Sequence, residues 1–133
     1  METTNAISAR SLQYYVIARC WASDLDFFKI ETDFLYRLLD DYRTRLTDYE
    51  HIDELRLMCT RLLKLEDDEV MIDELLTTQL KQFELMSEDI IPDDVETLVV
   101  NQVKLENLTA GLTNEYRKVK KDLFSLVKGV TQQ

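Results

Sequence analysis

The side chains that most often bind metals are scarce in this chain. Its 133 residues include one histidine, His51, and two cysteines, Cys20 and Cys59, without C-x-x-C spacing. Asp48-x-x-His51 could place two ligands on one helix face, but di-iron bundles need two Glu-x-x-His pairs and two further carboxylates. Zinc sites use three or four Cys and His ligands. We therefore expect no metal or other cofactor, and we interpret Asp48 and His51 as helix-end surface residues.

Covalent catalysis also lacks its usual patterns. The two glycines, Gly111 and Gly129, form neither a Gly-x-Ser-x-Gly turn nor a phosphate-binding loop. Cys59 lies eight residues from the only histidine, which is more than two helical turns, so no base stands ready to activate it. We predict that the protein is not an enzyme.

The charges of the chain are distributed unevenly. The formal net charge is -10, and residues 48–91 hold thirteen acidic and four basic side chains. Nucleic acids and anionic membranes need a basic face, so neither is an expected partner. A dense acidic patch is either a solvated helix face or a docking surface for a basic partner. It consists of Glu66, Asp67, Asp68, Glu69, Asp73 and Glu74.

One basic cluster interrupts this acidity. Arg117, Lys118, Lys120 and Lys121 make up the cluster. We expect a charge network between helices to account for it, with Arg61 and Lys64 beside it and Glu31 and Asp33 nearby. The first residues have no signal-peptide pattern, and no stretch of about 18 apolar residues occurs. With two cysteines suited to a reducing compartment, these features predict a cytoplasmic location.

The scarcity of chain breakers determines the expected fold. One proline and two glycines leave few places to turn, whereas a sheet needs turn residues every 8–12 positions or so. The sequence therefore predicts an all-α protein, an elongated antiparallel three-helix coiled-coil-like bundle. It would be a single domain over residues 1–133, with helices at about 8–46, 48–86 and 94–130.

Along each expected helix, a seam of residues repeats with alternating spacings of four and three, the pattern of a coiled coil. The seams are Ile7, Ser11, Tyr14, Ala18, Trp21, Leu25, Phe28, Thr32, Leu35, Leu39, Tyr42 and Leu46; Leu55, Met58, Leu62, Leu65, Glu69, Ile72, Leu76, Gln79, Phe83 and Met86; and Val95, Leu98, Gln102, Leu105, Thr109, Leu112, Tyr116, Val119, Leu123, Leu126 and Val130. Capping patterns at Thr47/Glu50 and Asp93/Glu96 mark the breaks between helices.

The polar residues on these seams need partners. With turns centred near 47–48 and 90, residue i of the first helix lies beside residue 95 − i of the second. Residue j of the second likewise lies beside 180 − j of the third, which puts Gln79 level with Gln102. We predict a buried hydrogen-bonded pair there, or else two exposed glutamines on a rotated seam. Glu69 also falls on a seam. We expect the helix to rotate locally so that Glu69 faces solvent; the alternative is a buried Glu69 that is neutralised by a proton or a partner.

The first helix also carries a second apolar stripe opposite its seam. It consists of Val16, Cys20, Phe27, Ile30 and Phe34. A helix that is apolar on two opposite faces is normally covered on both. We therefore expect this outer face to bind a second copy or another protein, unless the bundle is wide enough to absorb Phe27 and Phe34 at its flanks.

A segment of the first helix resembles a known group of proteins. Residues 21–31 read Trp-Ala-Ser-Asp-Leu-Asp-Phe-Phe-Lys-Ile-Glu, and residues 34–38 read Phe-Leu-Tyr-Arg-Leu. A tryptophan followed by a leucine, an aromatic pair, a glutamate and an Arg-Leu pair on one helix resembles small uncharacterised bacterial helical proteins. The resemblance implies a bacterial origin and no activity, cofactor or site residue.

Two functions fit these observations. The first is a non-enzymatic protein–protein interaction or scaffold module that self-associates through the outer face of the first helix. The alternative is a small-ligand-binding or sensory bundle, with a pocket around Trp21, Tyr14 and the level of Gln79 and Gln102.

Overall fold

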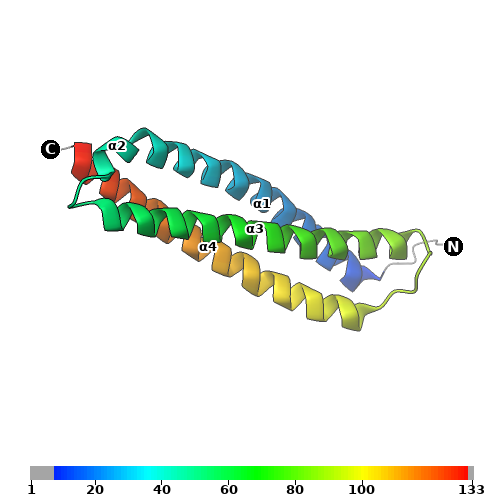
Figure 1. Cartoon of the computed structure of the whole chain (residues 1–133). Coiled ribbons are helices and arrows are strands. Elements are labelled where there is room, and N and C mark those ends of the chain that lie inside the picture. Colours follow the sequence, from blue (N-terminus) through cyan, green and yellow to red (C-terminus); the bar gives the residue numbers. More distant parts are fainter. Residues whose placement is uncertain (1–7, 132–133) are drawn as a thin grey trace. The chain divides into compact units, whose positions relative to one another are not determined.

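The computed structural model of the chain describes residues 8–131, which form α-helices and no strand. The helices are α1 (Ala9–Asp41), α2 (Arg43–Leu46), α3 (Ile52–Ser87) and α4 (Val95–Thr131) (Figure 1). The prediction of an all-α protein is confirmed. The predicted count differs, because a short fourth helix follows α1. Within residues 8–131, no helix carries an apolar stretch long enough to cross a bilayer.

The described residues divide into two compact units. Unit 1 consists of residues 8–25 and 70–110, and unit 2 consists of residues 26–69 and 111–131. Helices α1, α3 and α4 each contribute one stretch to each unit, and α2 belongs to unit 2. The single domain over residues 1–133 remains a prediction.

Within unit 2, α1 and α3 run in opposite directions. Thr32 hydrogen-bonds Glu69, and Tyr36 hydrogen-bonds Glu66, so residue numbers rise along α1 as they fall along α3. The predicted level for Thr32 was residue 63, which is six residues from its observed partner. The error comes from the turn, because α3 begins at Ile52 and not at residue 48.

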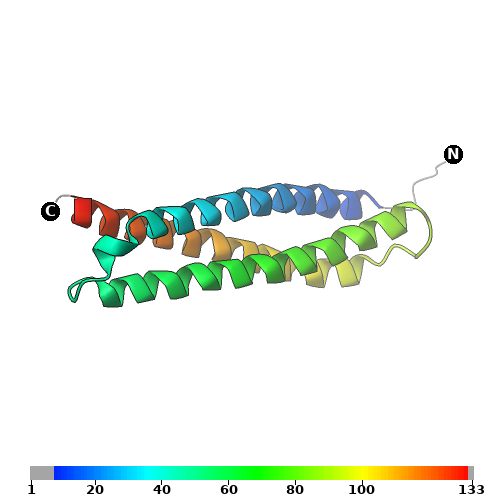
Figure 2. The same cartoon turned by 45° about the horizontal axis from the view of Figure 1, so that its top comes forward.

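In the same unit, α1 and α4 run in one direction. The Phe28 ring lies 5.2 Å from the Tyr116 ring, and Lys120 Nζ lies 3.4 Å from a carboxylate oxygen of Glu31. Numbers therefore rise together along both helices. Figures 1 and 2 show the α1, α3 and α4 stretches of unit 2 side by side, with α2 turning from α1 toward α3. Unit 2 thus has the up-down-up order that its short connections require.

The first predicted helix is interrupted near its end. Tyr42 has φ −104° and ψ 5°, and its N–H bonds the carbonyl of Leu39, three residues back. This geometry ends α1 and starts the short α2, whose Leu46 is completely buried. The break occurs without proline or glycine, so the continuous helix expected over 8–46 was wrong in its last turn.

The predicted seams describe the interior of both units. Every seam residue within 8–131 is buried or half-buried, and Ile7 lies outside the described residues. The largest completely enclosed side chains include Phe83, Leu35, Leu62 and Leu123. At about 25 cal/mol per Å² of apolar surface, burying such side chains stabilises the fold by roughly 1.5–3 kcal/mol each.

Neither of the two predicted helix caps lies at the predicted residue. Asp48 Oδ1 accepts the His51 N–H at 2.9 Å and so closes the turn that precedes α3, and Thr47 only bonds back to the Thr44 carbonyl. At α4, Asp94 accepts the N–H and the hydroxyl of Thr97. The capping pairs predicted at Thr47/Glu50 and Asp93/Glu96 were therefore wrong, because α3 begins further along the chain and Asp94 takes the cap of α4.

Asp93 has a different role in unit 1. Its carboxylate accepts the Ser8 N–H and the Ser11 hydroxyl, both at 2.8 Å. Desolvation raises the pKa of Asp93, but the hydrogen bonds from Ser11 and Ser8 outweigh it and hold the pKa below its usual value. The loop before α4 is thereby tied to the first turn of α1.

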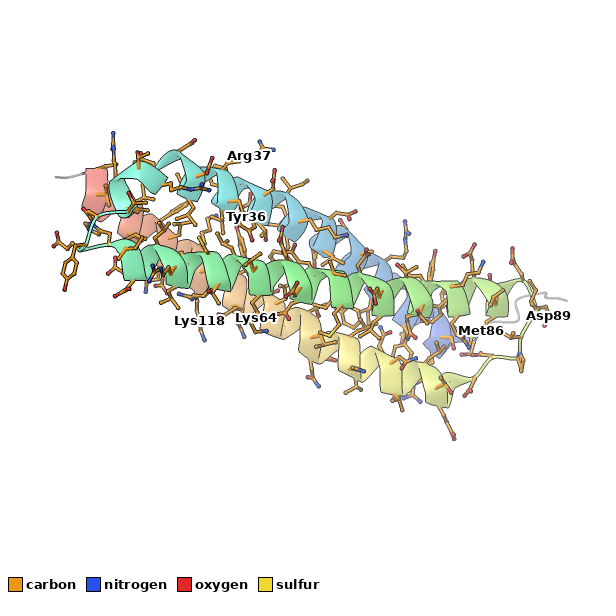
Figure 3. All side chains as sticks on the ribbon, in the orientation of Figure 1. Tyr36, Arg37, Lys64, Met86, Asp89 and Lys118 are labelled. Atoms are coloured by element: carbon orange, nitrogen blue, oxygen red, sulfur yellow. The ribbon has the colours of Figure 1, made fainter. Side chains whose placement is uncertain are left out.

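Helix α3 ends in a left-handed residue. Asp89 has φ 61°, its N–H bonds the Met86 carbonyl, and the N–H of Ile90 bonds the Leu85 carbonyl. Figure 3 shows Asp89 just past the end of the helix. These bonds form a Schellman motif, which usually places glycine at this position.

Candidate functional site

The outer face of α1 in unit 2 exposes three large apolar side chains. Phe27 is 54% exposed, Ile30 is 69% exposed and Phe34 is 47% exposed. The opposite face of the same stretch carries Thr32 and Leu35, which are buried. Contact with the rest of unit 2 therefore leaves about half or more of each of these three side chains uncovered, and the bundle does not absorb the two phenylalanines at its flanks.

The other two residues of the predicted stripe lie in unit 1. Val16 and Cys20 are both exposed. Val16 lines a shallow hollow of about 590 Å³ on α1, together with Leu12 and Ile17, which are also exposed. Each of the five predicted stripe residues is thus accessible within its own unit.

A row of aspartates flanks the exposed residues of unit 2. Asp26, Asp33 and Asp40 recur every seven residues along one edge of α1, and all three are exposed. Asp33 pairs with Arg37 at 2.5 Å, and Asp40 pairs with Arg43 at 2.6 Å. Figure 3 shows Arg37 pointing outward, whereas Tyr36 points toward α3.

Ring contacts connect the outer face of α1 to the interior of unit 2. The Phe27 and Phe28 rings meet edge-on at 5.8 Å, and Phe28 stacks at a tilt on Tyr116. The Tyr116 hydroxyl donates a short hydrogen bond to Glu31, which also receives one from Lys120. The Tyr116 bond is the main reason that the pKa of Glu31 is lowered, while burial and Glu31 raise the pKa of Tyr116.

The basic cluster of α4 is only partly paired as predicted. Lys120 does contact Glu31. Arg61 of α3 pairs instead with two acidic residues of α4, with Asp122 at 2.7 Å and with Glu115 at 3.8 Å. Lys64, which was predicted beside the cluster, bonds Asp68 on its own helix.

The two predicted glutamines meet inside unit 1. Gln79 Nε2 donates to Gln102 Oε1 at 3.1 Å and to the Leu98 carbonyl at 3.2 Å. Gln102 Nε2 in turn donates to the Tyr14 carbonyl of α1 at 3.0 Å, so the network joins all three helices of the unit. Gln79 Oε1 is buried and accepts no hydrogen bond. A flipped Gln79 amide would face two acceptors, so this orientation is the better one.

Glu69 is buried, contrary to the predicted rotation into solvent. It is 4% exposed and accepts a hydrogen bond from Thr32 Oγ1 at 2.6 Å. Desolvation raises the pKa of Glu69, opposed by the Thr32 bond and by nearby Lys29. The helix does not rotate, because Leu65 and Ile72 on the same seam are buried too. Thr32 on α1 supplies a hydrogen bond to the carboxyl group in its buried position.

Tyr36 is the second polar contact between α1 and α3. Its hydroxyl donates to Glu66 at 3.3 Å. Burial, with the neighbouring Glu66 carboxylate, raises the pKa of Tyr36 to about 12. The tyrosine therefore stays neutral at physiological pH and acts as a hydrogen-bond donor.

His51 sits at the start of α3 beside an open groove. Its Nδ1 lies 2.8 Å from Asp48 Oδ1, and this bond raises the pKa of His51 and lowers that of Asp48. The groove measures about 470 Å³ and lies between α3 and α4 of unit 2. Its lining includes Glu54, Arg61 and Asp122. The groove is not lined by Trp21 or Tyr14, around which a pocket was predicted.

The remaining candidate residues are the two cysteines and the acidic patch. Cys20 and Cys59 are free thiols. Among residues 8–131, no group of three or more His, Cys, Asp or Glu side chains is arranged to hold a metal ion. In the acidic patch, Glu69 turns inward while Glu66 and Asp67 are exposed, so the patch does not form a continuous surface.

Two of the polar contacts that sequence reasoning missed have identifiable causes. The contact between Thr32 and Glu69 was missed because the turn was predicted at the wrong position, although both residues lie on predicted seams. The bond from Ser11 to Asp93 was missed because Asp93 was assigned to the cap of α4. A loop carboxylate beside two serines of another helix end leaves no periodic signal in the sequence.

No protein-family model, no curated protein and no solved structure matches this chain. The resemblance of residues 21–38 to bacterial helical proteins therefore stays a prediction.

Proposed function

We propose that this protein is a non-enzymatic interaction or scaffold module that self-associates through the outer face of α1. The observation that carries the proposal is the exposure of Phe27, Ile30 and Phe34 on one face of one helix. Isolated exposed apolar residues are normal, but aligned ones mark binding surfaces. The proposal includes the predicted antiparallel three-helix coiled-coil-like bundle as the frame that holds this face.

The proposal places the protein in a reducing compartment such as the cytoplasm. The two free cysteines support this, since exposed thiols such as Cys20 are stable where disulfides are kept reduced. The partner is a protein surface and not nucleic acid, because the net charge of -10 opposes binding to phosphates.

The test measures the molar mass of the full chain by sedimentation equilibrium at roughly tens of micromolar, a range in which weak interfaces associate. We expect concentration-dependent association that Phe27→Asp together with Phe34→Asp abolishes without loss of helicity. Leu57→Asp with Leu63→Asp is the matched control, because these α3 leucines of unit 2 are 54% and 55% exposed. A wild-type monomer at every concentration, or equal association of the phenylalanine variant, contradicts the proposal.

A second candidate function is the binding of a small ligand, favoured by the groove beside His51. The groove combines the apolar Leu57 and Met58 with the carboxylates of Glu50 and Glu54, a lining suited to a small organic cation. Titration with small amines, followed through the His51 ring signals in NMR spectra, tests it. Shifts that saturate in the wild type and vanish in Glu50→Gln with Glu54→Gln would support ligand binding.

A further inference from the structure

A second exposed stripe lies on α4 of unit 2. Arg117, Lys121, Phe124 and Lys128 follow one another at spacings of four, three and four, which places them on one helix face. All four side chains are exposed, with Phe124 at 42%, and they lie opposite the buried Val119. We call these four residues the α4 stripe. It contains a single aromatic side chain among three cations.

The α1 and α4 stretches of unit 2 have opposite net charge. Residues 26–41 of α1 carry five acidic and two basic side chains, whereas residues 111–131 of α4 carry five basic and two acidic ones. Both α4 acids, Glu115 and Asp122, turn to Arg61 of α3. The cations of the α4 stripe therefore have no acidic side chain of their own helix on the same face.

We infer that the exposed α1 face of one molecule docks onto the α4 stripe of a second copy. The inference rests on the proposed self-association and names the surface that meets α1. Pairing two α1 faces would bring their aspartate rows, such as Asp26 and Asp33, against like charges. Pairing α1 with the α4 stripe sets those aspartates against Arg117 and Lys121. It also lets the long basic side chains cover the phenylalanine rings.

The size of the apolar patch sets the expected affinity. Each large side chain can bury about 150–250 Å², so three that are roughly half exposed offer about 300 Å². A standard stable interface needs about 800 Å² per partner. The contact is thus weak, it depends on its charges, and it is visible at high protein concentration and low salt. Because α1 and the α4 stripe are different surfaces, each molecule can use both, and assembly continues into rings or chains.

Charge reversal on either surface tests the inference. One full-length variant carries Arg117→Glu and Lys121→Glu, and the other carries Asp26→Lys and Asp33→Lys. Each is studied alone and in a one-to-one mixture by sedimentation equilibrium in about 0.05 M salt, where charges are weakly screened. Circular dichroism verifies that each variant keeps wild-type helicity. Lys81→Glu with Lys104→Glu, both exposed on unit 1, is the control with the same change in net charge as the Arg117→Glu/Lys121→Glu variant.

We expect each charge-reversed variant alone to associate at least about tenfold more weakly than the wild type, because like charges then face each other. The mixture should regain wild-type association, since each reversed surface finds its complement, and the control should behave as wild type. If the Arg117→Glu/Lys121→Glu variant alone associates like the wild type, α4 is not the partner surface and the inference is overturned. In that case the self-association through Phe27 and Phe34 stands, because only the loss of association in the phenylalanine variant tests it.

Discussion

Replacing Glu69 by glutamine should stabilise the protein at neutral pH. The side chain is 4% exposed, and Thr32 Oγ1 donates to it at 2.6 Å. Burial raises its pKa above the usual 4.5, so the folded protein holds this proton more tightly than the unfolded chain does. The free energy of unfolding therefore falls as the pH rises from the unfolded pKa through the folded pKa. Below both values the carboxyl group is neutral in either state, and the penalty disappears.

The magnitude follows from the cost of burying the charge. Each unit by which folding raises a pKa costs about 1.4 kcal/mol of stability once the pH exceeds the folded value. Exchanging buried ionic groups for apolar ones of similar volume often gains 1–4 kcal/mol. Glutamine keeps an acceptor for Thr32 but brings a buried amide N–H₂, so we expect about 1–2 kcal/mol at pH 8. For a chain of this length that corresponds to about 3–8 °C in Tm.

Urea unfolding followed by circular dichroism between pH 4 and 8 measures this difference. The Glu69→Gln variant should match the wild type near pH 4 and exceed it increasingly toward pH 8. Glu74→Gln is the control, because Glu74 is exposed on the same helix and loses the same charge. A gain that is constant across this range would mean that packing or helix propensity is responsible. A loss at pH 8 would mean that groups such as Lys29 stabilise the ionised form.

Three further changes test other parts of the structure. Gln79→Leu should lower the free energy of unfolding by about 1–3 kcal/mol, because it leaves Gln102 Oε1 buried without a donor. Adding Gln102→Leu should recover most of that loss in urea unfolding, since no buried amide then remains. Asp89→Gly should stabilise by about 0.5–1 kcal/mol, because φ is 61° there and glycine adopts it without strain, whereas Asp89→Ala should give no such gain in Tm. Asp93→Ala should lower the free energy of unfolding by about 1.5–3 kcal/mol at pH 7. Because the pKa of Asp93 is lowered in the folded protein, the stability that Asp93 contributes is lost as the pH falls through this pKa, so the difference measured by urea unfolding should shrink in acid.

The seams were predictable because they depend on periodicity alone. Leu62, Leu65 and Ile72 repeat at the helical spacing, and a helix with one such face has to bury it. Glu69 was assigned to the seam and then wrongly rotated out of it, since burying a carboxylate without a known partner is too costly to assume. Its partner Thr32 could be identified only once the register of α1 against α3 was known.

The position of the turn between α1 and α3 determines that register, and the sequence predicts this position poorly. The chain from Tyr42 to His51 contains no glycine or proline, so nothing marks where the helix ends. Asp48 and Thr47 are both good cap residues, yet α3 begins only at Ile52, four residues after the predicted start at residue 48. At the α3–α4 connection, Pro92 limited the choice, and the predicted level of Gln79 and Gln102 agrees with their observed contact.

The polar contacts explain why each unit has one helix register. A leucine seam fits its neighbour nearly as well after a shift of seven residues, so apolar packing alone leaves several registers close in energy. Such a shift would take Gln79 away from Gln102 and Glu69 away from Thr32, leaving buried polar atoms without partners. Each orphaned group costs about 1–3 kcal/mol, which is a large part of the total stability of a small protein. The same residues that lower the maximum stability therefore exclude the alternative pairings, which explains why polar side chains occupy the most buried face of these helices.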